Sequence, residues 1–152
     1  MTEQWGPFVW KLFHTLAYKI KPEHFNTYKD ELIYQIIQIA TYLPCPYCST
    51  HSKLFFQKHK RVINKITTKS ELIQLLYNFH NDVNKRLTKN IFPMESLKQY
   101  HTENTIQVIN LFINRYSISS RNTNLFHLAL ASKDILSKFM NWIQNNIHIF
   151  DK

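Results

Sequence analysis

The stretch WGPFVWKLFHTLAYKI, residues 5–20, carries the pattern from which the fold is predicted. Its apolar side chains recur every three or four positions, which is the spacing of one face of an α-helix. Beside that face runs a second row at spacing four, made of Trp10, His14 and Tyr18, whose rings have polar tips. This row could be a seam between two helices or a wall for a flat ligand, and its residues alone favour the seam.

Further helical patterns follow along the chain. The same apolar spacing predicts helices over residues 25–43, 46–59, 68–87, 95–116 and 125–147. Pro44 ends the first of these, because the residue before a proline avoids helical angles, and Pro46 suits the first turn of the next. Thr68 and Glu71 have the spacing of a capping box. Residues 117–124, SISSRNTN, form the clear polar break before the last helix.

Composition supports an all-α fold. A chain of 152 residues usually forms one domain, and a hydrophobic content of 44% is enough for a packed core. Gly6 is the only glycine, whereas sheet proteins need glycine at turns and bulges. The segment after the polar break is predicted to be an appendage to a core of four or five helices.

The formal net charge of +9 favours an anionic partner, for which nucleic acid is the usual candidate. The lysines are spread along the chain, however, so an ordinary charged surface or one basic pocket for a phosphate-bearing cofactor is the preferred interpretation. No apolar run approaches the roughly 20 residues of a membrane span, and the N-terminus lacks a signal-peptide pattern. Two cysteines are too few for a secreted disulfide scaffold, so we expect a cytosol-like compartment.

The last helical pattern carries a long apolar face, formed by Leu128, Ile135, Leu136, Phe139, Ile143 and Ile147. Burial of each large apolar side chain contributes about 1.5–3 kcal/mol, so this face should pack on the chain's own core or on a second subunit. It contains no cysteine and therefore cannot relay electrons. We predict a structural role for it, with self-association favoured over packing within the chain.

The two cysteines, Cys45 and Cys48, lie in the stretch LPCPYCSTH. A pair at this spacing can close a disulfide, hold half of a metal site or attach a haem. Haem attachment needs a histidine directly after the second cysteine, where this chain has Ser49, and a thioredoxin-type site needs a βαβ context that is missing. A zinc site needs about four ligands, and the finger spacing is absent although histidines are at hand, namely His51, His59 and His80.

A redox disulfide on a helical scaffold is therefore the favoured interpretation of the cysteine pair. The N-terminus of a helix carries partial positive charge and free N–H groups, which stabilise a thiolate. Such a low-pKa cysteine is what thiol–disulfide exchange requires. Because a dithiol does not easily pass two electrons to oxygen, a cofactor that accepts a pair is needed, and flavin is the common choice.

The predicted helix over residues 68–87 has an unusual polar row beside its apolar stripe. Where a surface helix would show lysine and glutamate, this row holds Tyr77, His80, Asn81, Asn84 and Lys85. Asparagine and histidine lower helix propensity, so another interaction should compensate. We interpret this row and the ring row of the first helix as the two walls of a flavin pocket.

Three motifs together resemble the Erv/ALR family of FAD-linked sulfhydryl oxidases: WGPFVWKLFHTLAYK at residues 5–19, PCPYCSTH at 44–51 and HNDVNKRLTK at 80–89. Each motif is weak alone, but the three occur in the family's order and spacing. Within the family the chain looks most like the short members encoded by large DNA viruses that replicate in the cytoplasm. The resemblance implies a four-helix bundle with a short fifth helix, which we assign to residues 1–118. Residues from about Tyr116 onward match nothing in the family, and we predict an extra C-terminal helix over 119–152.

The resemblance also implies roles for individual residues. Cys48 would be the cysteine beside the flavin ring, and Cys45 the one that exchanges with the substrate. Contacts to FAD are implied for Gly6, Trp10, His14, Tyr18, His51, His80, Asn81, Val83, Asn84, Lys85 and Lys89. Many members read WGR where this chain has Pro7, so any contact made by that arginine is absent.

These features predict an FAD-dependent thiol oxidase that forms disulfides in partner proteins and passes electrons to oxygen, giving hydrogen peroxide. The chain lacks the shuttle cysteines of cellular members, so the substrate must reach Cys45 directly, and a thioredoxin-like dithiol protein is the expected donor. The resemblance implies a homodimer in the host cytoplasm and, for a viral protein, in the virion. The alternative is a zinc-stabilised or nucleic-acid-binding helical interaction module.

Overall fold

The structure, a computed structural model, describes residues 4–122 and 126–152. Its helices are α1 (Gly6–Lys19), α2 (Pro22–Thr41), α3 (Pro46–Lys58), α4 (Lys60–Ile63), α5 (Lys69–Arg86), α6 (Thr105–Arg121) and α7 (Phe126–Asn146), with 3₁₀ segments η2 (Met94–His101) and η3 (Ile147–Ile149). Among these residues the only β-type pairing is an isolated bridge between Ile20 and Phe150. The predicted all-α class is therefore confirmed. None of the described helices is long and apolar enough to cross a bilayer.

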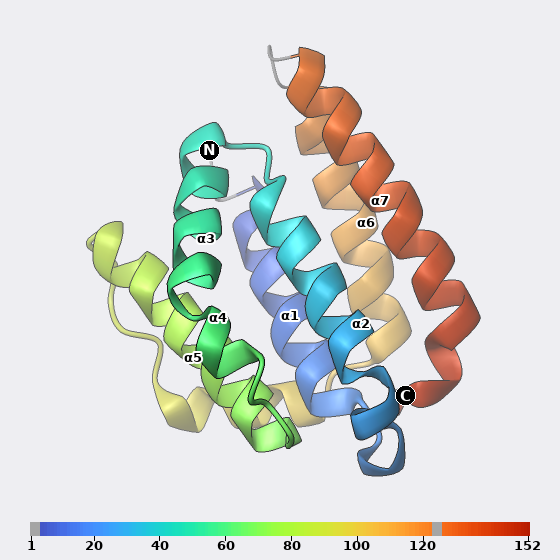
Figure 1. Cartoon of the computed structure of the whole chain (residues 1–152). Coiled ribbons are helices and arrows are strands. Elements are labelled where there is room, and N and C mark those ends of the chain that lie inside the picture. The colour runs from blue at the N-terminus through green and yellow to red at the C-terminus, as the bar shows by residue number, and fades with distance from the viewer. Residues whose placement is uncertain (1–3, 123–125) are drawn as a thin grey trace.

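Helix α1 lies at the centre of the molecule, packed against α5, α6 and η2 (Figure 1). Leu12 and Phe13 are completely buried, and so are the polar side chains of His14 and Thr15. The sequence pattern predicted one buried face, but the middle of α1 is buried on all sides because neighbouring helices surround it. The ring row of α1 is consequently inside the protein, where it can meet α5.

Helix starts follow the local signals of the sequence. Pro7, Pro22 and Pro46 lie in the first turns of α1, α2 and α3, where a missing N–H costs nothing. The capping box of Thr68 and Glu71 is present at the start of α5, with both reciprocal hydrogen bonds.

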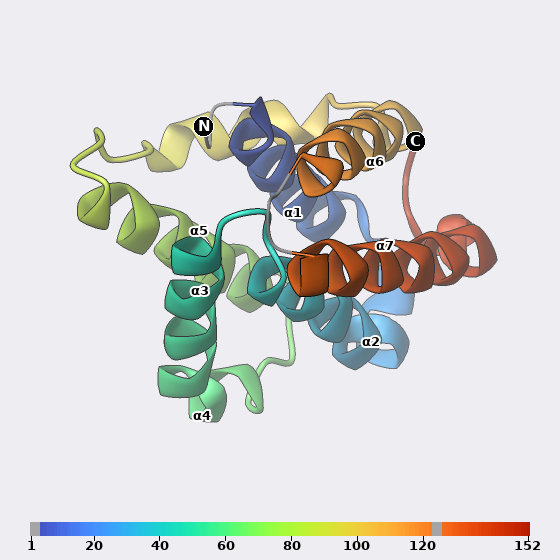
Figure 2. The same ribbon diagram turned by 90° about the horizontal axis from the view of Figure 1, so that it is seen from above.

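Seen from above, α3, α4 and α5 lie on one side of α1, and α6 and α7 lie on the other (Figure 2).

The predicted helix over residues 95–116 is wrong in its boundaries. Its first part is the 3₁₀ segment η2, and α6 begins only after Asn104, whose side chain accepts a hydrogen bond from the Gln107 N–H. Asparagine at this position satisfies a free N–H of the first turn, which favours a new helix start there. Helix α6 then continues to Arg121 through most of the predicted break at residues 117–124, of which 123 and 124 lie outside the described residues.

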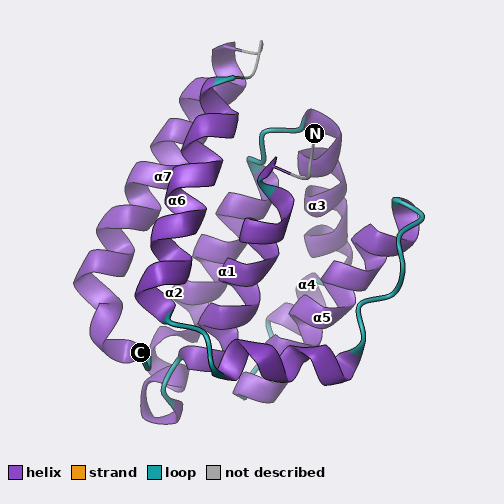
Figure 3. Ribbon diagram, turned by 180° about the vertical axis from the view of Figure 1, so that it is seen from behind, coloured by secondary structure: helices purple, strands orange, loops and turns teal. Residues whose placement is uncertain are grey.

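Helix α7 packs against α6 and α2 along most of its length (Figure 3). The apolar face predicted for the last helix is used within the chain, because Ile135, Leu136, Phe139 and Ile143 belong to the main core cluster. The prediction that self-association buries this face is therefore wrong. Helical periodicity shows that a face must be covered, but it does not show which surface covers it.

Candidate active site

Cys45 and Cys48 are joined by a disulfide at the N-terminal end of α3. Cys45 is the N-cap residue, with extended backbone angles of φ −128° and ψ 112°. Its Sγ accepts a hydrogen bond of 3.2 Å from the backbone N–H of Cys48. A helix N-terminus that donates to this sulfur stabilises negative charge on it, so the local structure favours a Cys45 thiolate when the disulfide is reduced.

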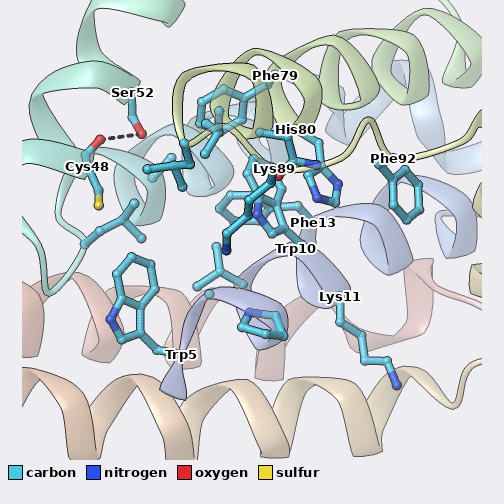
Figure 4. Close-up of a pocket in the computed structure, with 18 of the residues that line it drawn as sticks. Trp5, Trp10, Lys11, Phe13, Cys48, Ser52, Phe79, His80, Lys89 and Phe92 are labelled. Carbon is cyan, nitrogen blue, oxygen red and sulfur yellow. Dashed lines mark hydrogen bonds between the residues drawn. The ribbon is translucent and has the colours of Figure 1, made fainter. Parts of the chain in front are cut away.

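The two cysteines face different surroundings. Cys48 lines a cavity of about 480 Å³, whereas Cys45 is not part of its lining. The other walls come from α1, the end of α2, α3, α5 and the segment that follows α5. Figure 4 shows the Cys48 side chain at one edge of this cavity, together with the rings of Trp5, the residue before α1, and of Trp10 on α1. Cavities of this size are typical of sites for organic ligands and cofactors.

Eight of the residues predicted to bind the cofactor or transfer electrons line the cavity: Gly6, Trp10, Cys48, His51, His80, Val83, Asn84 and Lys89. Other predicted residues do not line it. Tyr18 lies farther along α1, beside Tyr100 and His101, and Lys85 is exposed on α5.

Three rings form a stack along the cavity wall. The Trp10 and His80 rings have centroids 4.1 Å apart and lie within 7° of parallel. The Phe92 ring stacks on His80 as well, at 4.6 Å and 19°. The structure thus combines both interpretations of the ring row, because Trp10 belongs to a seam between α1 and α5 and also forms part of the cavity wall.

His14 lies behind this stack and supports it from the core. Its Nε2 is 2.9 Å from Nδ1 of His80, and its side chain is completely buried. Burial, with a smaller effect of His80, lowers the pKa of His14 to about 3. Burial, with a smaller effect of the Lys89 charge, lowers the pKa of His80 to about 4. Both rings are therefore neutral at pH 7, and one donates the proton that the other accepts.

Asn81 fixes the segment that follows α5. Its Nδ2 donates to the Phe92 carbonyl at 3.1 Å, and its Oδ1 accepts from the Phe92 N–H at 2.8 Å. The sequence predicted that Asn81 contacts the cofactor. In the structure its amide is occupied by Phe92 and it does not line the cavity, so it acts on the site by holding Phe92 against His80.

The end of α5 brings Lys89 to the cavity. The Thr88 N–H donates to the Lys85 carbonyl at 3.2 Å, and the Lys89 N–H donates to the Asn84 carbonyl at 2.8 Å, which is the hydrogen-bond pattern of a Schellman motif. Thr88 adopts φ 53°, the only positive φ of a non-glycine residue in the described parts of the chain. The motif reverses the chain, and the Lys89 side chain reaches over the cavity (Figure 4).

Buried polar atoms without partners lie at the cavity wall near the disulfide. Within the described structure, Nε of Arg86 has no hydrogen-bond partner, and Nε2 of His51 lies 2.8 Å from Oδ2 of Asp82 without meeting hydrogen-bond geometry. Burial and the Arg86 charge lower the pKa of His51, and the Asp82 carboxylate opposes them. The Arg86 guanidinium also packs on the Tyr47 ring, 4.4 Å from its centroid.

Sequence reasoning missed several residues of the cavity wall, namely Trp5, Phe13, Phe79, Arg86, Phe92 and Tyr100. Trp5, Phe13 and Phe79 belong to apolar stripes and looked like ordinary core residues. Arg86 lies inside the third motif, which could have pointed to it. Phe92 and Tyr100 come from the irregular segment and η2, where no periodicity indicates the direction of a side chain.

No group of three or more histidine, cysteine, aspartate or glutamate side chains in residues 4–122 and 126–152 is arranged to hold a metal ion.

Comparison with known proteins relates this cavity to a family of enzymes. Residues 7–104 match the profile of the Erv1 / Alr family. FAD-linked sulfhydryl oxidases from two isolates of African swine fever virus, one Kenyan and one Malawian, are each 30% identical to the chain over 106 residues, covering 69% of it and 86% of each relative. No solved structure shows significant similarity. The family match includes every residue of the cavity wall except Trp5 and Gly6.

Proposed function

Because the chain belongs to the Erv1 / Alr family and is an FAD-dependent thiol oxidase, we propose that Cys45 exchanges with the substrate and Cys48 passes electrons to the cofactor. One observation carries this assignment: Cys48 lines the cavity and Cys45 does not. The N-terminus of α3 also stabilises negative charge on Sγ of Cys45. This suits the cysteine that leaves as a thiolate when the oxidised substrate departs.

The residues of the cavity fit FAD. The aromatic stack of Trp10, His80 and Phe92 offers flat surfaces to ring systems. Lys89 and the unpartnered Nε of Arg86 supply positive charge and a donor for phosphate oxygens. We propose that these side chains hold the cofactor, together with the remaining predicted contacts at Gly6, Tyr18, His51, Val83, Asn84 and Lys85, and that His14 and Asn81 hold the wall in place.

The disulfide chemistry follows from thiol–disulfide exchange. A substrate thiolate attacks Sγ of Cys45, a mixed disulfide forms, and the Cys45–Cys48 bond breaks with Cys48 leaving as a thiolate. The second substrate thiol then displaces Cys45, so that the substrate leaves as a disulfide and both cysteines are reduced. Bound FAD would supply the acceptor for this electron pair and two protons, with oxygen as the final acceptor and hydrogen peroxide as the product, and the loss of the pair from Cys48 would re-form the Cys45–Cys48 disulfide.

The physiological setting is proposed from the family. A thioredoxin-like dithiol protein is the substrate, and the working form is a homodimer in the host cytoplasm or the virion. We propose that residues 1–118 are the oxidase domain and 119–152 a C-terminal extension. The family match ends earlier, at residue 104, and the proposed boundary falls within the last turn of α6. Light scattering on the flavin-loaded protein measures its oligomeric state.

The roles of the cysteines are tested with the two single variants, loaded with FAD. Each variant is mixed with a peptide whose cysteine carries a thionitrobenzoate leaving group, and the release of thionitrobenzoate is followed. Cys48→Ser, which keeps Cys45, should react faster than Cys45→Ser, because Cys48 faces the cavity. Both variants should lose dithiothreitol oxidation. Faster reaction of Cys45→Ser would reverse the two roles.

A further inference from the structure

We propose that the outer face of α3 and α4 is the docking surface for the substrate protein, and that this substrate carries acidic side chains near its cysteine pair. The proposal rests on the proposed function, since it concerns the protein that delivers electrons to Cys45.

An exposed ridge runs from the disulfide along α3 and into α4. Tyr47, Leu54 and Lys58 fall seven and then four positions apart, which places them on one face of α3. Tyr47 is 62% exposed and Leu54 is 60% exposed, although both are large apolar residues. Arg61 and Val62 of α4 continue the exposed surface, and we call these five residues the α3–α4 ridge.

The ridge begins at the redox pair and projects from the body of the molecule. Figures 1 and 2 show α3 and α4 on the side away from α6 and α7. Tyr47 lies between the two cysteines in sequence, and the Arg86 guanidinium 4.4 Å from its ring braces it from α5. A protein that rests on the ridge therefore has its thiols next to Cys45.

The ridge is basic, and the stretch of sequence that contains it has no acidic residue. Between Glu31 and Glu71 the chain contains no aspartate or glutamate, but it contains Lys53, Lys58, Lys60, Arg61, Lys65 and Lys69. Among the described residues no carboxylate forms a salt bridge with any of these cations. Unpaired positive charge beside a reaction site attracts negatively charged partners and raises their rate of association.

The composition of the ridge favours a protein partner over nucleic acid. Tyr47, Leu54 and Val62 are exposed between the cations, and protein interfaces combine an apolar and aromatic centre with a charged rim. A nucleic-acid surface of the same charge would use these positions for further phosphate contacts. The observations therefore point to an acidic dithiol protein.

The test compares two reduced peptides with the same central Cys-Gly-Gly-Cys, flanked on both sides by glutamates in one and by lysines in the other. Steady-state oxidation is measured with the full-length, FAD-loaded protein at low and high salt. The acidic peptide should have a kcat/KM about tenfold higher at low salt, with the difference shrinking as salt screens the charges. The double variant Lys58→Glu/Arg61→Glu should lose this preference.

A matched control reverses two lysines of α7, on the opposite side of the molecule. Lys133→Glu/Lys138→Glu changes the net charge by the same amount and should keep the peptide preference. Dithiothreitol, which needs no docking surface, should be oxidised equally by all three proteins. If none of them oxidises dithiothreitol, the proposed function fails.

Three other outcomes overturn the docking proposal while the proposed function stands. In the first, the wild type oxidises both peptides equally while it still oxidises dithiothreitol. In the second, the two double variants lose the preference to the same extent, which would make it an effect of net charge alone. Alternatively, a duplex DNA oligonucleotide binds the wild type, the ridge variant loses that binding, and no peptide preference exists, which would assign the ridge to nucleic acid.

Discussion

The contact between His14 and His80 joins the core of the protein to the wall of its cavity. Both side chains are buried, and their ring nitrogens lie 2.9 Å apart. Burial disfavours the charged form of either ring, which is the main reason why both pKa values lie well below the ordinary value of 6.5. The pair is thus a stable support for the cavity only while it remains neutral.

Replacement of His14 tests this support. In the unfolded chain His14 takes up a proton as the pH falls below about 6.5, whereas in the folded protein it stays neutral until about pH 3, so acid favours unfolding. Between pH 7 and 5 this linkage lowers the free energy of unfolding by up to about 2 kcal/mol. In urea denaturation of the apoprotein, His14→Gln should show a shallower loss of stability over this range. An unchanged pH dependence would show that His14 is not buried in its neutral form.

At the residue scale, the sequence predicted which residues belong to the site better than it predicted where each side chain lies. Trp10, His80 and Cys48 were expected at the cofactor and do line the cavity. Asn81 was expected there too, but its amide is bonded to Phe92, a partner in an irregular segment that periodicity does not describe. Which polar side chain faces a cavity and which one supports it depends on tertiary contacts.

At the scale of elements, the end of α5 combines an ordinary motif with an unusual residue. A Schellman motif needs a left-handed residue, which is commonly glycine, because a Cβ atom clashes in that conformation. Here Thr88 takes the position with φ 53°, and threonine is β-branched. The protein therefore carries backbone strain beside Lys89, at the turn that brings this side chain to the cavity.

Substitution of Thr88 by glycine should relieve the strain. Thr88→Gly is expected to raise the free energy of unfolding by about 1 kcal/mol, even after the larger entropy that glycine gives to the unfolded chain. Thr88→Ala keeps a Cβ atom and should stabilise the protein less than glycine does. Urea denaturation measures both variants. A glycine variant that is less stable than the alanine variant would contradict a left-handed Thr88.

Helix boundaries were predictable where a local signal exists. Prolines and the capping box marked the starts of α3 and α5 correctly. The 3₁₀ segment η2 and the extension of α6 to Arg121 were missed, because packing rather than propensity decides them. Ser120, for example, looks like a break residue but is buried in the last turn of α6.

At the scale of the whole molecule, the two C-terminal helices hold the end of α2 just before the redox pair. The carbonyl of Tyr42 accepts hydrogen bonds from the Tyr116 hydroxyl on α6 and, at 3.1 Å, from the Ser132 hydroxyl on α7. Burial raises the pKa of Tyr116 to about 12, against a smaller opposing effect of Ser132, so Tyr116 remains a donor at neutral pH. The predicted appendage thus contacts the segment that leads to Cys45.

Removal of the two hydroxyls tests this connection. Tyr116→Phe and Ser132→Ala should each lower the free energy of unfolding by about 0.5–1.5 kcal/mol, the usual net value of one hydrogen bond. The double variant should lose more than the sum, because the Tyr42 carbonyl then has no partner. A double-mutant cycle in urea measures this coupling. Simple additivity would show that the two hydroxyls do not share one acceptor.

The central claim is that electrons reach FAD through Cys48, and visible absorption during anaerobic addition of dithiothreitol tests it most directly. The wild-type protein should purify yellow, lose its flavin absorption on addition of dithiothreitol, and regain it in air. Cys48→Ser should bind FAD and keep its absorption under the same treatment, since the path from the substrate is interrupted. Bleaching of Cys48→Ser at the wild-type rate would contradict the claim.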